Sequence, residues 1–137
     1  METIQEVHDS GNVVVGVDNF YQGMLISSPD PNLQAMGVKY EIYPDSNEIF
    51  RRVQTGSAVY IGNEGYLEFI IVTKFTERGQ PKMRVMKECF ASHSISMALQ
   101  THSPLKRNFD KVISRMLSAG LIRRYFLNSI NLAASTK

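Results

Sequence analysis

The sequence predicts an α/β fold in which a central sheet is flanked by helices. Three observations support this prediction. The run Val13-Val14-Val15-Gly16-Val17 is apolar and β-branched throughout, as in a strand buried on both faces of a sheet. Segments with helix-start signals alternate with further strand-like runs along the chain. The 137 residues suffice for one domain with a substantial core.

Short helices are expected where a capping residue precedes apolar positions at helical spacing. The first of them begins at a capping box, Thr3 to Glu6. The expected helices cover residues 4–9, 20–26 and 32–36 and a segment entered at 44–48, with Gly11, Gly37 and Gly56 as stops.

Strands are expected where β-branched or alternating apolar residues lie between turn signals. Besides residues 13–17, they are 57–61, 83–88 and 95–99, with an exposed loop at 77–81. Residues 66–75 combine β-branched side chains with apolar positions at helical spacing, and we prefer a helix there.

The best-defined helix is expected from Pro104 to Ser118. Ser103 offers a hydroxyl as a cap, Pro104 takes the first helical position, and Gly120 ends the segment. Its apolar residues form one continuous face: Leu105, Phe109, Val112, Ile113, Met116 and Leu117.

Charge is distributed unevenly along the chain. Residues 103–137 carry seven Lys or Arg against the single acid Asp110, whereas residues 1–102 carry eight Lys or Arg against twelve acids. The two parts therefore sum to +6 and −4. A basic helix can bind nucleic acid or membrane headgroups, or it can be a solvated outer face.

Several classes of protein are not supported by the sequence. The longest apolar run, Tyr66 to Val72, is interrupted by Glu68 and falls short of the roughly 20 residues of a membrane span. The first residues lack the pattern of a signal peptide. Cys89 is the only cysteine and no metal-ligand spacing surrounds it, so no disulfide within the chain, metal or cofactor is expected. Catalytic motifs are also absent, so an enzyme is not expected.

Two turns are the candidate ligand-binding residues. Asp18-Asn19 follows the first buried strand, and Gly62-Asn63-Glu64 follows the strand at 57–61. Ligands of open α/β sheets bind outside the carboxyl ends of the strands. If the two strands are parallel neighbours, both turns lie on one edge. Alternatively, these residues serve only as helix caps and turn formers.

The order of elements resembles the second ligand-binding segment of ionotropic glutamate receptors, and is most similar to the insect chemosensory ionotropic receptors. Ser94 to Leu99, followed by Ser103-Pro104-Leu105, is similar to the family's strand and Ser-(Ser/Pro)-Leu helix start. Met116 to Ile122 is similar to its L-x-E-x-G-L-L ending, and Thr3 to Val7 resembles its opening.

The resemblance implies lobe 2 of a periplasmic-binding-protein-like (type II) clamshell at residues 1–102. Residues 103–127 would be helices that pack on lobe 1, and residues 128–137 a frayed tail. The chain would then be an extracellular segment of a ligand-gated cation channel in the cell membrane. Its partners would be the missing first lobe, the transmembrane helices and the co-receptor subunits of a tetramer, and no nucleic acid. A small-molecule ligand would close the clamshell and thereby open the pore.

The ligand implied by the resemblance is not glutamate. Family members that bind glutamate use a Ser/Thr pair after a Gly-Ser turn, whereas Asp18 to Gly23 reads DNFYQG. The family's acid for the amino group falls on Gly62, with Glu64 two residues later. A volatile acid, an amine or no ligand remain open. Cys89 matches a family cysteine whose usual partner lies nearer the C-terminal end, where this chain has none.

Two other functions stay open, a stand-alone soluble binding module of periplasmic-binding-protein type and a small basic α/β protein that is an enzyme or binds nucleic acid. The receptor interpretation makes one structural prediction. The face formed by Leu105, Phe109, Val112 and Met116 should be poorly buried within this chain, because its partner lobe is missing.

Overall fold

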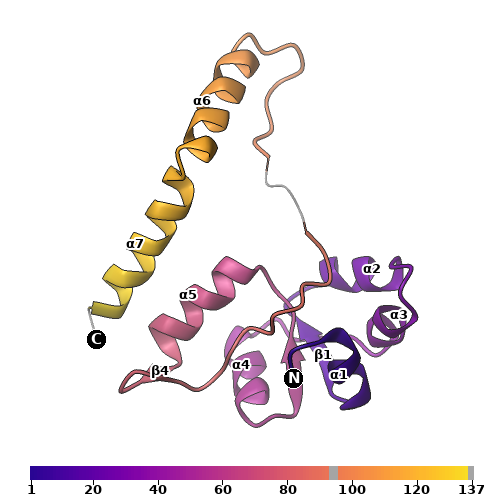
Figure 1. Cartoon of the computed structure of the whole chain (residues 1–137). Coiled ribbons are helices and arrows are strands. Elements are labelled where there is room, and N and C mark those ends of the chain that lie inside the picture. The colour runs from indigo at the N-terminus through magenta and orange to yellow at the C-terminus, as the bar shows by residue number, and fades with distance from the viewer. Residues whose placement is uncertain (93–95, 136–137) are drawn as a thin grey trace. The chain divides into compact units, whose positions relative to one another are not determined.

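The computed structural model describes residues 1–92 and 96–135. The chain divides into two compact units, unit 1 at Met1–Ala91 and unit 2 at Ser92–Lys137 (Figure 1). This division falls earlier than the boundary expected after residue 102, because residues 96–102 form no strand that would join them to the sheet.

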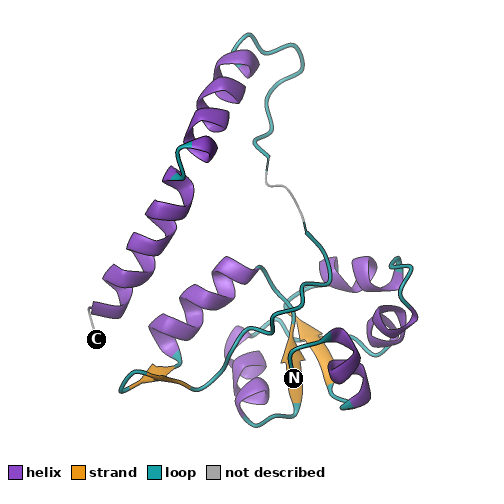
Figure 2. Cartoon of the chain, in the orientation of Figure 1, coloured by secondary structure: helices purple, strands orange, loops and turns teal. Residues whose placement is uncertain are grey.

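Unit 1 is built on a small parallel sheet of three strands in the order β2-β1-β3. The strands are β1 at Val13–Gly16, β2 at Glu41–Ile42 and β3 at Ala58–Tyr60. Helices α2 (Phe20–Ile26) and α3 (Pro31–Val38) connect β1 to β2, and α4 (Ser46–Gln54) connects β2 to β3. Figure 2 shows how small the sheet is beside its helices. The α/β prediction is confirmed at this level.

The sheet is covered on both faces, as the β-branched run predicts. Val14 lies in a cluster with residues of α2, α3 and the first helix, α1 (Ile4–Asp9). The next residue, Val15, lies in a second cluster with Ile49 of α4 and Ala58 of β3. Successive side chains of a strand point to opposite faces, so β1 contributes to both clusters.

Side chains cap the helices at the expected places. The Thr3 Oγ1 accepts a hydrogen bond from the Glu6 amide at 3.2 Å, while the Glu6 carboxylate accepts one from the Glu2 amide at 2.7 Å. The capping box therefore forms with its second bond moved by one residue. Helix α5 (Glu64–Lys74) is capped by Asn63, which confirms the preference for a helix over residues 66–75.

Gly37 does not end the helix expected at 32–36. It lies inside α3, where an added Cβ would lie 2.9 Å from Leu25 Cβ and from Ile26 Cγ1 of α2. The glycine therefore allows α2 and α3 to approach closely. Strand β2 was not expected, because it has two residues and both are exposed.

Residues 83–88 do not form the expected strand. A hairpin of β4 (Thr76–Glu77) and β5 (Gln80–Pro81) occupies the expected loop, and the chain then runs irregularly. Hydrogen bonds hold this segment to the start of the chain. The Ile4 amide donates to the Glu88 Oε2 at 2.7 Å, the Glu88 amide donates to the Glu2 carbonyl at 3.2 Å, and Arg84 pairs with the Glu2 carboxylate at 2.8 Å.

Unit 2 consists mainly of α6 (Lys106–Ser118) and α7 (Leu121–Ser135). The expectation that Ser103 caps this helix with Pro104 at its first position is wrong. Helix α6 begins at Lys106 after the N-cap Leu105, which has no side-chain capping bond, while the Ser103 Oγ accepts from the Leu105 amide at 3.3 Å. Gly120 separates the helices with a φ of +66°, as expected from its position. In Figure 1, α7 follows α6 instead of folding back along it.

Two expectations for this part of the chain are not met. Ile95 of the strand predicted at 95–99, together with Ser94 before it, lies outside the described residues. The rest of the predicted strand, Ser96 to Leu99, forms no strand. The tail at 128–137 is helical as far as Ser135 instead of frayed. Leucine and alanine favour helix there, and the hydroxyl of Ser129 donates to the Tyr125 carbonyl within the helix.

The apolar face of α6 is uncovered. No residue of α6 or α7 is buried. Leu105, Phe109 and Val112 are 53%, 40% and 53% exposed, and Met116 is half-buried. The described residues of unit 2 (92 and 96–135) therefore form no buried core that covers this face.

Candidate functional site

The two candidate turns lie on one edge of the sheet. Strands β1 and β3 are parallel neighbours, with Val15 paired to Tyr60 and the Ile61 amide donating to the Val15 carbonyl at 3.2 Å. Beyond this pairing, β1 continues into Asp18-Asn19 and β3 into Gly62-Asn63-Glu64. Both turns therefore follow the carboxyl ends of adjacent strands, which is the placement required for a common ligand site.

The turn at Asp18 is held by bonds from two directions. Its Oδ1 accepts from the Phe20 amide at 2.9 Å, and its backbone carbonyl accepts from the Tyr40 hydroxyl at 3.0 Å. The Tyr40 side chain passes directly over Gly16, where a Cβ would lie 1.7 Å from the hydroxyl oxygen. Only glycine leaves room for this contact. Burial, followed by the negative charge of Asp18, raises the pKa of Tyr40 to about 12.

The second turn begins α5. The Asn63 Oδ1 accepts from the Tyr66 amide at 3.2 Å, so Asn63 is a helix cap. Glu64 is the first helical residue, and its exposed carboxylate has no hydrogen-bond or ion-pair partner in the described chain. Gly62 has room for an ordinary Cβ, about 3.4 Å from the Tyr60 ring, so space does not require glycine there.

Helix capping uses some of the polar groups of the candidate residues, and the other polar groups are available to a ligand. Asp18 and Asn63 each use one side-chain oxygen to cap a helix. Asn19 stands at the N-cap of α2 without a side-chain capping bond. The polar groups left for a ligand therefore include the second Asp18 oxygen, the Asn19 amide, the Asn63 side-chain NH2 and the Glu64 carboxylate.

Tyrosines surround this edge, and the sequence analysis missed them. Burial raises the pKa of Tyr60, and Tyr66, Tyr21 and Asp18 raise it further. The Tyr21 ring also packs edge-on against Phe90 at a centroid distance of 6.2 Å. Tyr60 ends β3 and Tyr66 lies in the first turn of α5, so aromatic residues next to the candidate turns were the available signal.

The edge is acidic. The third turn, between β2 and α4, contains Asp45, whose Oδ1 accepts from the Asn47 amide at 2.9 Å. The three turns at residues 17–19, 43–45 and 61–64 together contain Asp18, Asp45 and Glu64 and no lysine or arginine. Exposed apolar side chains, Phe20 and Ile42 among them, lie next to these acids in the chain. The chemistry of the edge suits a cation with an apolar body.

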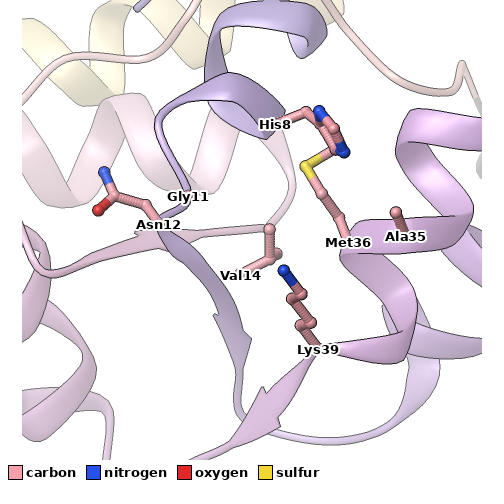
Figure 3. A pocket seen from close by; sticks show the side chains of 7 residues that line it. All are labelled: His8, Gly11, Asn12, Val14, Ala35, Met36 and Lys39. Carbon is pink, nitrogen blue, oxygen red and sulfur yellow. The ribbon is translucent and has the colours of Figure 1, made fainter.

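A hollow of about 110 Å³ lies at the opposite end of β1 (Figure 3). Its lining comes from the end of α1, the turn before β1 and the end of α3, and consists of His8, Gly11, Asn12, Val14, Ala35, Met36 and Lys39. The space is small for an organic ligand, and none of the candidate residues lines it.

Comparisons of the chain with models of protein families, with curated proteins and with solved structures gave no match. Among the described residues, no three His, Cys, Asp or Glu side chains are grouped so that they could hold a metal ion. In the same part of the chain, no helix has the length and apolar character needed to cross a membrane. Cys89 is exposed and unpaired.

Proposed function

We propose that unit 1 is one lobe of a periplasmic-binding-protein-like clamshell that binds a small molecule at the carboxyl edge of its sheet. The observation that supports this is the parallel pairing of β1 with β3, because it brings Asp18-Asn19 and Gly62-Asn63-Glu64 to the same edge. A single lobe offers one wall of such a site. The first lobe, which the resemblance to ionotropic receptors implies, would supply the other wall.

The proposed ligand is an amine with an apolar body. Asp18 and Glu64 offer carboxylate oxygens, whereas the cation beside the third turn, Arg52, lies over the Tyr43 ring and is already paired with Glu48 and Glu41. Tyr60 and Tyr66 offer aromatic faces that attract a cation. This chemistry disfavours glutamate and a volatile acid, and it favours the amine among the ligands left open by the sequence.

In the receptor, ligand closure of two lobes would open a cation-selective pore in the cell membrane. This step rests on the resemblance, which spans about residues 2–127. The complete transcript should then encode apolar segments of about 20 residues on both sides of this chain. A transcript without them would limit the proposal to a stand-alone binding module.

The ligand site can be tested on the isotope-labelled chain by NMR titration. Phenethylamine and 3-phenylpropanoate differ in charge and have the same aromatic ring. Phenethylamine should shift the amide resonances of residues 17–20 and 61–66, whereas 3-phenylpropanoate should not. Shifts confined to the hollow at His8 and Lys39, or none at all, would remove the edge as a ligand site.

Two substitutions test the acids. Asp18→Asn keeps the oxygen that caps α2, and Glu64→Gln keeps the size of the side chain. Each should weaken phenethylamine binding about tenfold, the effect of losing one charge-assisted hydrogen bond. Glu68→Gln is the matched control, because Glu68 is an exposed acid one turn further along α5. If Glu68→Gln weakens phenethylamine binding equally, the loss comes from the net charge of the protein and not from contact of Asp18 or Glu64 with the ligand.

A further inference from the structure

Helices α6 and α7 present large apolar side chains that the described residues of unit 2 leave exposed. On α6 the exposed side chains include Phe109 and Val112, and Met116 of the same face is half-buried. On α7 the exposed apolar side chains are Ile122, Tyr125, Leu127 and Leu132. An exposed apolar area of this extent indicates a surface that binds a membrane or another molecule.

The charged residues of the same helices are almost all cationic. Residues 96–135 contain six Lys or Arg and one acid. The acid, Asp110, is paired with Lys106 at 2.6 Å. The remaining cations have no acidic partner in the described part of the chain: Arg107, Lys111, Arg115, Arg123 and Arg124.

Helix α4 of the same chain shows the usual pairing of cations with acids on a solvated helix face. Its Arg51 and Arg52 both pair with Glu48, at 2.7 Å and 3.1 Å. Mixed charges of this kind are typical of a helix face in water. The unbalanced positive charge of α6 and α7 therefore needs a different explanation from that of α4.

The charge selects among the possible partners of the apolar face. A second copy would bring the same excess of positive charge against the first, so self-association is opposed. An anionic bilayer, in contrast, attracts this positive charge. The Debye length at physiological salt is about 8 Å, close to the helix diameter of about 10 Å. The negative charge of the bilayer therefore still attracts cations on the side of α6 that faces away from it.

We propose that α6 and α7 lie along the surface of an anionic phospholipid bilayer. An interfacial helix has an apolar stripe with aromatic residues and leucine, a polar face rich in Lys and Arg, and low overall hydrophobicity. Helix α6 has Phe109 and Leu117 on one side and Lys111 on the other. This proposal goes beyond the ligand site and does not rest on it.

Tryptophan fluorescence tests the orientation on the full chain, which contains no natural tryptophan. Phe109→Trp places the probe on the apolar face, and Ser114→Trp places it on the polar side of the same helix. With vesicles of phosphatidylcholine and phosphatidylserine, emission of Phe109→Trp should shift to the blue and that of Ser114→Trp should not. No shift, or equal shifts for both, would overturn the proposal and assign the face to a protein partner such as the missing lobe.

Charge variants test the role of the cations. Lys111→Gln combined with Arg115→Gln should weaken partition into these vesicles at least tenfold, because each cation near an anionic surface accounts for roughly a fivefold effect. The control, Lys74→Gln with Lys87→Gln, removes the same charge from exposed positions of unit 1 and should leave partition unchanged.

Changes in lipid composition and in protein concentration distinguish an anionic bilayer from a neutral bilayer and from a second copy of the chain. Partition should fall as salt is raised and should be lost on pure phosphatidylcholine. Equal partition into neutral vesicles would overturn the anionic-surface proposal. A blue shift of Phe109→Trp that appears without vesicles as protein concentration rises would assign the face to a second copy instead.

Discussion

The contact between Gly16 and Tyr40 makes the most direct prediction about the candidate edge. In Gly16→Ala the new methyl carbon would lie 1.7 Å from the Tyr40 hydroxyl oxygen and 2.8 Å from its Cζ. The ring cannot move freely, because Tyr40 is only 7% exposed and belongs to the cluster on one face of the sheet. The substitution therefore expels the tyrosine or distorts β1.

The magnitude follows from two losses. Overpacking of a well-packed site costs about 1–3 kcal/mol. Loss of the hydrogen bond from Tyr40 to the Asp18 carbonyl costs about 1 kcal/mol more. Gly16→Ala should therefore lower the free energy of unfolding by about 3 kcal/mol, and Tyr40→Phe alone by about 1 kcal/mol. In the double variant the bond is already lost and the nearest clashing atom is gone, so Tyr40→Phe should cost nothing further.

The four proteins of this double-mutant cycle can be compared by urea unfolding, monitored by far-UV circular dichroism. The expected coupling between the two positions is about 1 kcal/mol or more, because the double variant should be no less stable than Gly16→Ala. Costs that add to within about 0.5 kcal/mol would refute the reasoning, since independent sites behave in that way.

Three further predictions concern other parts of unit 1. Gly37→Ala should lower the free energy of unfolding by about 1–3 kcal/mol in urea, because its Cβ meets α2, whereas Gly23→Ala, with open space around it, should raise it by about 0.5–1 kcal/mol. Glu88→Gln should weaken the bond to the Ile4 amide and speed hydrogen exchange in α1; unchanged exchange would show that the bond contributes little. Hydrogen bonds from Arg51 and then Arg52 lower the pKa of Glu48 to about 2, so the stability they add is present above pH 4.5 and is lost as the pH falls toward 2. In acid titration the stability difference between wild type and Glu48→Gln should be constant above about pH 4.5 and should shrink as the pH falls toward 2, and a difference that does not change with pH would contradict it.

The parts of the fold that depend on local signals could be predicted from the sequence. Thr3 caps the first helix, Gly120 adopts a left-handed conformation, and Val14 and Val15 face opposite sides of the sheet, all as expected. Each of these outcomes is decided within a few residues of chain. The candidate turns required one further condition, the parallel pairing of β1 with β3, which joins distant residues and which the structure meets.

The parts that depend on distant residues could not be predicted. Residues 83–88 resembled a strand, but the segment is irregular, and Met86 and the later Phe90 pack against the cluster on one face of the sheet. Gly37 resembled a helix stop because its contact with α2 is invisible in the local sequence. Tyr40 joins the edge only because it crosses Gly16, twenty-four positions earlier in the chain.

The bonds between Glu2 and the segment at 84–88 give unit 1 a mechanical property. They fasten the place where the chain enters the unit to the place where it leaves, close to Ala91. A load that arrives through the connection to unit 2 meets these bonds before it reaches β1. Pulling on the two ends of unit 1 would therefore load the bonds between Glu2 and residues 84–88 first.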